Sequence, residues 1–255
     1  MSLLPDRIQP LNDTGVQEGA RYVLYWMEQS QRAQHNPALE RALHHASETG
    51  LPLLVVCGVT DDFPEATLRH HTFLLEGLQE TKQRLADRGL KLVVREGAPD
   101  DVALEYAGAA AVLVTDRGYL RHQKQWRARV AEEAPCRVEQ VEGDVVVPVE
   151  TVTDKAEYAA RTIRPKIHEH LERCLKLPEP VPVETPSLDL DIDSGRSLDD
   201  IEAVTDQMDL DRRVGAVSDL YPGGVSEAEA ILDDFLAEHL DGYDENRNQI
   251  HSHAV

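Results

Sequence analysis

The 255-residue chain has few cysteines, few lysines, few aromatic residues and no long apolar segment. Its three cysteines, Cys57, Cys136 and Cys174, are far apart and form no CxxC pair, which argues against a disulfide framework and against a cysteine zinc site. No apolar run approaches the roughly 20 residues that span a bilayer, and the first residues lack the basic and then apolar order of a secretory signal. We therefore expect a cytoplasmic protein without a membrane contact.

Positive charge is also scarce. The chain has 26 Lys and Arg residues against 47 Asp and Glu residues, which gives a formal net charge of −21 at pH 7. Such a chain repels a polyphosphate backbone at long range, so we expect weak or no nucleic-acid binding by the segment as a whole. An acid-rich, lysine-poor surface also suits a salt-filled cytoplasm, where screening reduces self-repulsion, and it favours a halophilic source over an ordinary acidic bacterial protein.

Several familiar binding and catalytic motifs are missing. There is no GxGxxG after the first predicted strand, no P-loop sequence and no GxSxG elbow, so a classical dinucleotide site, a nucleotide-triphosphate loop and an esterase-type nucleophile are not expected. The adjacent pairs His44-His45 and His70-His71 fall on predicted helices and diverge, and no histidine pair at i, i+4 spacing comes with a carboxylate. We predict no metal site and assign no catalytic residue.

Apolar runs of strand length alternate with amphipathic stretches between residues 21 and 144. Asn36 and Pro37 give one helix a cap and a first-turn proline, and Gly50 follows its last residue. Because alternating strands and helices at this spacing form βαβ units, we predict an α/β fold with a five-stranded parallel, Rossmann-like, doubly wound sheet. The predicted strands are 21–27, 53–59, 90–95, 111–115 and 137–141, and the predicted helices are 37–49, 68–88, 99–106 and 119–133.

The pattern changes after residue 144. We predict a helix at 155–175 and a short helix at 198–208, and between them the prolines and acids of 177–197 indicate an exposed linker. Ser226 is predicted to cap a further amphipathic helix, with Glu229 completing a capping box. The predicted division is a tail at 1–20, an α/β domain at 21–176, the linker at 177–197 and a few helices at 198–255.

The carboxyl ends of the predicted strands form the candidate ligand cleft, because ligands of open parallel sheets bind there. These ends carry aromatic, acidic and basic side chains that suit a planar, weakly anionic ligand, although a solvated edge without a ligand would give the same pattern. Trp126, on a predicted helix, is expected in the core instead. The candidate cleft residues are Trp26, Met27, Gln31, Arg32, Thr60, Asp61, Thr115 and Asp116.

A second feature is the basic run of Arg161, Arg164 and Lys166 on the helix predicted at 155–175. It could form a phosphate-binding or partner-docking patch, or it could be only a solvated helix face. The sequence leaves both interpretations open.

Three collinear segments carry a family resemblance. The first has Tyr25-Trp26-Met27, Gln31-Arg32, Asn36 and Ala38-Leu39. The second and most specific has Val146-Val147-Pro148-Val149, Lys155, Glu157-Tyr158, Ala160-Arg161-Thr162, Arg164 and Lys166-Ile167. The third has Gly223-Gly224, Glu227-Ala228, Phe235, Leu240, Tyr243 and Arg247-Asn248. These segments resemble the DNA photolyases, and specifically the class II cyclobutane pyrimidine dimer photolyases.

The resemblance implies a two-part light-driven lyase. An N-terminal α/β domain would hold an antenna chromophore, a deazaflavin or a folate, and a C-terminal helical domain would hold FAD beside the flipped thymine dimer of damaged DNA. Excited reduced flavin would donate an electron and the cyclobutane ring would split. Of the flavin-contacting positions that the resemblance implies, this chain keeps Tyr243.

The resemblance also implies a Ser-x-Leu-Ser-Pro-Tyr-Leu segment and further flavin-binding helices, which do not occur in these 255 residues. We therefore expect the N-terminal part of a deoxyribodipyrimidine photolyase, inactive in repair by itself. The alternative is a chromophore-binding module that acts in trans with a separately encoded catalytic half. An absorbance spectrum of the purified chain would discriminate an antenna from a flavin.

Overall fold

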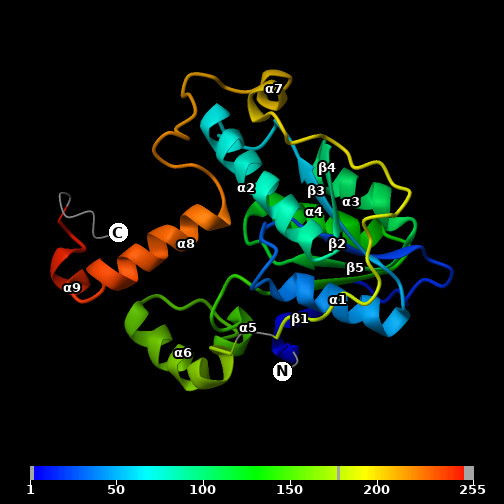
Figure 1. The fold of residues 1–255 in the computed structure, drawn as a ribbon. Helices are drawn as coiled ribbons and strands as arrows, with labels where there is room; N and C mark the ends of the chain where they lie inside the picture. Colours follow the sequence, from blue (N-terminus) through cyan, green and yellow to red (C-terminus); the bar gives the residue numbers. More distant parts are fainter. Residues whose placement is uncertain (1–2, 177–178, 250–255) are drawn as a thin grey trace. The chain divides into compact units, whose positions relative to one another are not determined.

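The computed structural model describes residues 3–176 and 179–249, which form two compact units (Figure 1). The first unit comprises residues 1–64 and 82–197, and the second comprises 65–81 and 198–255. Helix α2 (Leu68–Asp87) begins in the second unit and ends in the first. The first unit holds the whole sheet and is described first.

The sheet has six strands in the order β1-β6-β5-β2-β3-β4. Five strands run parallel, as the sequence predicts: β2 (Tyr22–Trp26), β3 (Leu53–Val59), β4 (Lys91–Glu96), β5 (Ala110–Asp116) and β6 (Arg137–Val141). The chain builds outward from β2 through β3 to β4 and then returns to β5 on the other side of β2. The strand order therefore reverses between β2 and β5, where ligands of such sheets bind.

The sixth strand corrects the expectation of a purely five-stranded sheet with a free tail. Strand β1 (Ile8–Pro10) pairs antiparallel with β6 and follows a short helix, η1 (Pro5–Arg7). The guanidinium of Arg7 is buried and donates to the carbonyl oxygens of Glu142, Val145 and Val146 at 2.7–2.9 Å. Three residues of edge strand, ending in a proline, give no periodic signal in a sequence, and for this reason the pattern did not predict it.

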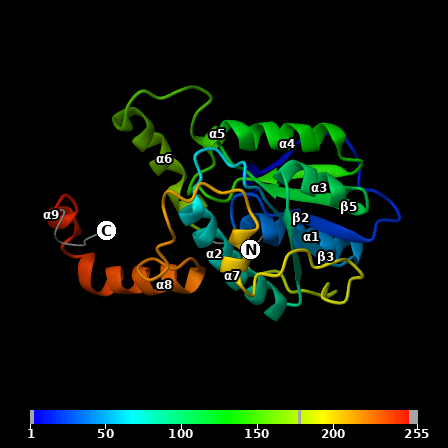
Figure 2. The ribbon, with the colours of Figure 1, turned by 90° about the horizontal axis from the view of Figure 1, so that it is seen from above.

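Helices cover both faces of the sheet. Figure 2 shows α1 (Pro37–Thr49) on one face and α3 (Pro99–Ala107) and α4 (Arg121–Glu133) on the other. The main core cluster lies under α3 and α4 and includes Trp26, Leu113 and Val130, each 0% exposed. Helix α1 begins at the predicted cap, where Asn36 Oδ1 accepts from two backbone N–H groups at 3.1 Å, and Gly50 follows it with φ 68°.

Most of residues 179–197 are exposed, in line with the prediction for 177–197, but part of this segment docks beside β4. Ser187 is 0% exposed, its N–H donates to the Gly89 carbonyl at 2.8 Å, and its hydroxyl accepts from the Lys91 N–H at 2.8 Å. Gly195 pairs with Val94 in a parallel bridge at φ 71°, where an added Cβ would lie 2.1 Å from the Val94 oxygen. Proline and acid content predicted the irregular backbone but not its docking beside β4. Residues 177 and 178 lie outside the described residues.

Two further helices of the first unit follow β6. These are the single turn α5 (Val149–Val152) and the longer α6 (Ala160–Cys174), which contact each other. Helix α6 begins five residues later than the predicted start at 155, because its cap is Ala159.

The second unit contains α7 (Ile201–Asp206), α8 (Val225–Asp234), η2 (Phe235–His239) and α9 (Tyr243–Asn246). The expected capping box of Ser226 and Glu229 is wrong. The cap of α8 is Gly224, and the Ser226 hydroxyl instead donates to Glu80 Oε1 at 2.6 Å. Among residues 3–176 and 179–249, every helix is too short or too polar for a membrane crossing.

Candidate functional site

Asp116, the last residue of β5, ties down the loop that follows β2. Its carboxylate accepts the Tyr25 hydroxyl at 3.0 Å and the backbone N–H groups of residues 28–30 at 3.1–3.3 Å. Asn36 extends the network by donating to Tyr25 Oη at 2.9 Å. Burial raises the pKa of Asp116 to about 6, while the hydrogen bonds from residues 28–30 and Tyr25 oppose that rise. Asp116, at the end of β5, therefore fixes the loop that follows the neighbouring strand β2.

Half of the predicted cleft residues lie inside the protein. Trp26, Met27, Thr115 and Asp116 are 0–2% exposed, so they do not line an open cleft, which corrects the expectation for these four. Thr115 Oγ1 donates to the Trp26 carbonyl at 3.1 Å, and the Trp26 ring belongs to the core. Their position at the strand ends was predicted correctly, but their depth depends on the covering loop.

The other four predicted residues remain partly exposed. Arg32 donates to Asp144 at 3.2 Å and to the His35 carbonyl at 3.2 Å, beyond the end of β6. Gln31 lies beside Arg32 and donates to the Glu28 carbonyl at 3.5 Å. Thr60 and Asp61 directly follow β3, and the Thr60 hydroxyl accepts the Asp62 N–H at 3.1 Å. These residues keep access to solvent at the carboxyl edge of the sheet.

Three aromatic rings gather at this edge, and the sequence did not single them out as a group. Phe63 comes from the loop after β3, and its ring meets the His122 ring edge-on at 4.8 Å. His122 in turn meets Trp126 at 4.8 Å, one turn further along α4. Trp126 is half-buried and packs against the core cluster, as expected, while Phe63 is 36% exposed. The available signal was the i, i+4 spacing of His122 and Trp126 together with an aromatic residue in a strand-end loop.

Buried polar atoms at the same edge have no partner among the described residues. They are Trp26 Nε1, Glu28 Oε1 and His122 Nε2. Buried polar groups are nearly always hydrogen-bonded, so Glu28 Oε1 and His122 Nε2, whose residues are only partly buried, suit a bound polar molecule, whereas Trp26 lies in the closed core. Glu28 Oε2 faces Arg127 Nη1 at 3.2 Å, and burial raises the pKa of Glu28 to about 7 although Arg127 lowers it.

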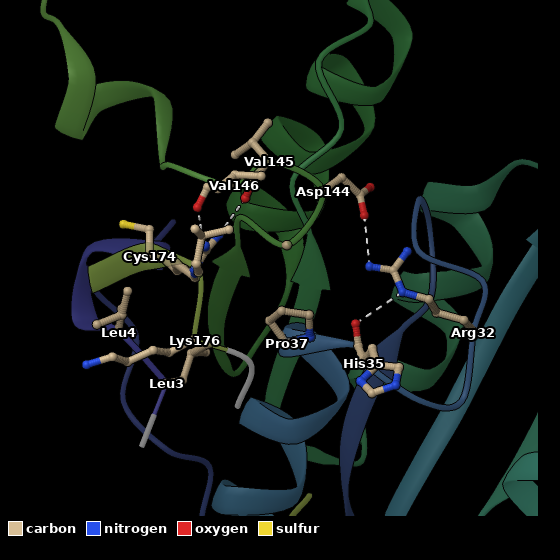
Figure 3. A pocket seen from close by; sticks show the side chains of 13 residues that line it. Leu3, Leu4, Arg32, His35, Pro37, Asp144, Val145, Val146, Cys174 and Lys176 are labelled. Atoms are coloured by element: carbon tan, nitrogen blue, oxygen red, sulfur yellow. Dashed lines mark hydrogen bonds and ion pairs between the residues drawn. The ribbon is translucent and has the colours of Figure 1, made fainter. Parts of the chain in front are cut away.

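Arg32 also lines a separate cavity of about 440 Å³ (Figure 3). Arg32 and Asp144, which are joined by a hydrogen bond of 3.2 Å, lie on one side of the cavity, Lys176 lies on the other side, and Pro37 at the start of α1 lies between them. Two arginines line this cavity, and both already have partners in the protein. Arg7 donates to backbone carbonyls, and Arg32 forms an ion pair with Asp144. The lining starts at Leu3 and ends at Lys176, next to residues outside the described ranges, so we assign no ligand to this cavity.

Tyr243, the residue implied for a flavin, lies in α9 of the second unit. Its ring meets the Phe235 ring edge-on at 5.7 Å, and the guanidinium carbon of Arg247 lies 6.0 Å from its centroid. One aromatic ring that already has two partners is too little to hold an isoalloxazine, so the described residues do not fit FAD. No three His, Cys, Asp or Glu side chains gather around a potential metal position in residues 3–176 and 179–249.

Comparisons with known proteins point to one family. The family model described as DNA photolyase matches residues 23–187. A deoxyribodipyrimidine photo-lyase from Methanothermobacter thermautotrophicus is 42% identical over 247 residues, which are 95% of this chain and 53% of the relative. A protein of the same name from Potorous tridactylus is 31% identical over 95% of this chain and 46% of its own length. The chain thus spans about half the length of these curated relatives.

Solved structures support the fold at lower identity. A bacterial class III photolyase from Agrobacterium tumefaciens has a TM-score of 0.63 at 20% identity and covers 89% of this chain and 47% of its own. A cryptochrome from Synechocystis has a TM-score of 0.68 at 17% identity, with 89% and 49% covered. An archaeal photolyase from Sulfolobus tokodaii, solved with two FAD molecules, has a TM-score of 0.61 at 17% identity, with 82% and 45% covered.

Proposed function

Because the chain belongs to the DNA photolyase family, we propose that it supplies the light-harvesting part of a deoxyribodipyrimidine photo-lyase, which repairs cyclobutane pyrimidine dimers in light. The observation that carries this proposal is the family match over residues 23–187, which covers most of the first unit. The activity and the damaged-DNA substrate come from the names of relatives aligned over 95% of the chain. They belong to the proposal because the chain spans about half of each relative.

Class II membership is part of this proposal. It rests on the three motif segments, and above all on the run from Lys155 to Ile167. The names of the curated relatives state no class, and the class III structure is only 20% identical, so it supports the fold alone.

We place the antenna chromophore at the carboxyl edge of the sheet, beside Phe63, His122 and Trp126. A flat aromatic ligand, a deazaflavin or a folate, would find ring surfaces there for stacking. The unpartnered Glu28 Oε1 and His122 Nε2 belong to side chains of residues that are only partly buried, and they give this edge hydrogen-bonding capacity that the protein leaves unused. When bound, the chromophore would supply absorption of light and transfer of the excitation energy.

The protein's own contribution at this edge is to hold and orient the ligand. Gln31, Arg32, Thr60 and Asp61 can supply polar contacts at the rim, since each keeps some solvent access. Glu28 can donate a hydrogen bond in its protonated form and accept one in its ionised form, because its pKa of about 7 lies near neutral pH. No step through FAD follows from this chain, because Tyr243 alone does not form a flavin site.

Binding spectroscopy on the purified chain tests the chromophore proposal. We expect a deazaflavin or a folate to bind with a shifted absorbance band and quenched fluorescence, because aromatic rings would stack on it. Phe63→Ala should weaken binding, while Phe235→Ala, which removes a ring of the second unit, should leave it unchanged. Equal effects of the two changes, or no spectral shift with either chromophore, would refute the site.

A repair assay tests the activity separately. Adding the purified chain to FAD and dimer-containing DNA under blue light should give no repair, because the described residues do not fit a flavin. Repair by the chain alone would contradict our conclusion that the described residues do not fit a flavin. The same assay on a preparation that also contains the rest of a photolyase should show light-dependent repair.

A further inference from the structure

The exposed face of helix α6 is the strongest feature that the proposed function does not use. Residues 155–176 contain six Lys and Arg residues and three Glu residues, in a chain whose net charge is −21. Arg161, Arg164 and His168 lie on one side of α6, at i, i+3 and i+7, and all three are exposed. On the opposite side Ile163 and Ile167 are partly buried, and Cys174, at 4% exposed, is the one buried residue of the helix. The basic side therefore faces solvent because the apolar side faces the protein.

Arg161 and Arg164 are also without partners among the described residues, and most arginines of this acidic chain are not. Arg129 binds three carboxylates, and Arg41 and Arg117 bind one or two each. Lys166 of the same helix is paired with Glu157 at 2.5 Å, so that carboxylate does not neutralise the two arginines. A protein with 47 acids that leaves two neighbouring arginines unpaired keeps them available for an external anion.

Two neighbouring features suit a nucleic-acid strand. Tyr158, two residues before the start of α6, is 98% exposed and offers a ring on which an unpaired base can stack. The cap residue Ala159 has no side-chain hydrogen bond to the helix, so the first N–H groups of α6 remain open to a phosphate oxygen. The stripe from Arg161 to His168 covers about 10 Å of helix, against one phosphate per roughly 3.4 Å along a DNA strand.

We propose that Tyr158, Arg161, Arg164 and His168 form a contact surface for a DNA strand, with the two arginines on phosphates, the tyrosine on an unpaired base and the His168 ring beside the strand. This inference rests on the proposed function, since it adds a DNA contact from the light-harvesting part of a repair enzyme. The net charge of −21 does not exclude a local contact, because charges farther away than about 10 Å are largely screened at roughly 0.1 M salt. It does make the contact weak. Because lower salt strengthens both the arginine–phosphate contacts and the long-range repulsion, binding is measured over a salt series that starts low and includes roughly 0.1 M.

Fluorescence anisotropy with a short, labelled, undamaged single-stranded DNA tests this surface. The double charge reversal Arg161→Glu and Arg164→Glu should weaken binding by at least about tenfold at low salt. It should also reduce the slope of log K against log salt by about 1.4, as expected for two lost phosphate contacts on a single strand. Far-ultraviolet circular dichroism establishes that the variant remains folded.

The matched control is the pair Arg121→Glu and Lys124→Glu on α4, which makes the same change of net charge at two exposed positions. We expect this pair to leave DNA binding within about twofold, because it lies outside the α6 surface. If both pairs of substitutions weakened DNA binding equally, the loss would follow from the change in net charge alone, and the proposal would be overturned. An undetectable affinity of the unchanged protein throughout the salt series would also overturn it.

Two more measurements separate recognition of a DNA strand from attraction of any polyanion. Tyr158→Ala should weaken the binding of single-stranded DNA by roughly 5- to 150-fold, because a stacked base is lost, and should weaken the binding of duplex DNA much less. Poly-glutamate of comparable charge should compete poorly, and equal competition would overturn the proposal in favour of an acidic protein. Because the DNA is undamaged, failure of light-dependent repair would remove the proposed photolyase activity and leave this result standing.

Discussion

The carboxyl edge of the sheet and helix α6 both carry motif residues of the photolyase resemblance. Most of those at the sheet edge are buried, whereas most of those on α6 are exposed to solvent. At the sheet edge, Tyr25 and Asn36 are 0% exposed and hydrogen-bonded to protein. On α6, Arg161 and Arg164 are exposed, and Tyr158 just before it is 98% exposed. A motif therefore does not tell whether its residues hold the fold or meet a ligand. Burial and hydrogen-bond partners decide that, and substitutions can test it.

The largest effect should come from Asp116→Ala, because one buried carboxylate serves the Tyr25 hydroxyl and three backbone N–H groups of residues 28–30. Leaving these donors without an acceptor should lower the free energy of unfolding by about 4 kcal/mol. Urea denaturation followed by circular dichroism measures it. Asp189→Ala, at an exposed position, is the control and should change stability by less than about 0.5 kcal/mol. If Asp116→Ala changed the free energy of unfolding only slightly, the loop after β2 would keep its conformation without the Asp116 carboxylate.

The second effect should come from Asn36→Ala. Asn36 caps α1 through two backbone N–H groups and donates to Tyr25 Oη and two carbonyls, all in the interior. Its loss should cost about 3 kcal/mol, more than a cap alone. Asp200→Ala removes the exposed cap of α7, which accepts from the Ala203 N–H at 2.9 Å, and should cost about 1 kcal/mol. Equal costs for the two caps would contradict the buried network.

The third effect is a pH dependence from Glu28. Its pKa is about 7 in the folded protein against 4.5 for an unperturbed glutamate, so the folded state binds the proton more tightly. Stability from this group is therefore fully present below pH 4.5 and is lost as the pH rises to 7, by about 3 kcal/mol. Comparing urea midpoints of the wild type and Glu28→Gln across this range isolates the effect, since Asp116 contributes to both proteins. Parallel curves would show that the Arg127 ion pair keeps Glu28 ionised.

Glu139 provides the opposite sign within the same unit. The hydrogen bonds from His45 and Arg41 outweigh burial and lower its pKa to about 2. Its stabilisation is present above pH 4.5 and is lost as the pH falls towards 2. A loss of stability below pH 4.5 in Glu28→Gln would therefore come from Glu139 and would not count against the prediction for Glu28.

The regular elements of the first unit could be predicted because their signals are local. Strand β3 at Leu53–Val59 and the cap of α1 at Asn36 both follow from short-range patterns of apolar residues and cap residues. Strand β1 and the docking of residues 179–197 could not, because each depends on a distant partner. Ser226 had a cap sequence, but Glu80, 146 residues away, takes its hydroxyl.

The candidate site shows the same division. The strand-end position of Thr115 and Asp116 followed from the alternation of strands and helices, but their burial depends on the loop of residues 28–36 that closes over them. Phe63 and His122 lie on different elements far apart in the sequence, so no periodicity could join their rings. Which side chains stay exposed at the carboxyl edge of the sheet therefore follows from the three-dimensional structure and not from the sequence pattern.

The smallest effect on stability should come from Tyr158→Ala on the α6 surface. A side chain that is 98% exposed buries almost no apolar area, so its truncation should change the free energy of unfolding by less than about 0.5 kcal/mol. Tyr25→Phe is the contrasting change, because it removes only a hydroxyl and yet takes one buried hydrogen-bond partner from Asp116 and one from Asn36. We expect Tyr25→Phe to cost about 1–2 kcal/mol and to leave DNA binding unchanged, whereas Tyr158→Ala should do the reverse. Should Tyr158→Ala destabilise the protein as much as Tyr25→Phe, Tyr158 would be part of the fold and α6 would lose its role as a free surface.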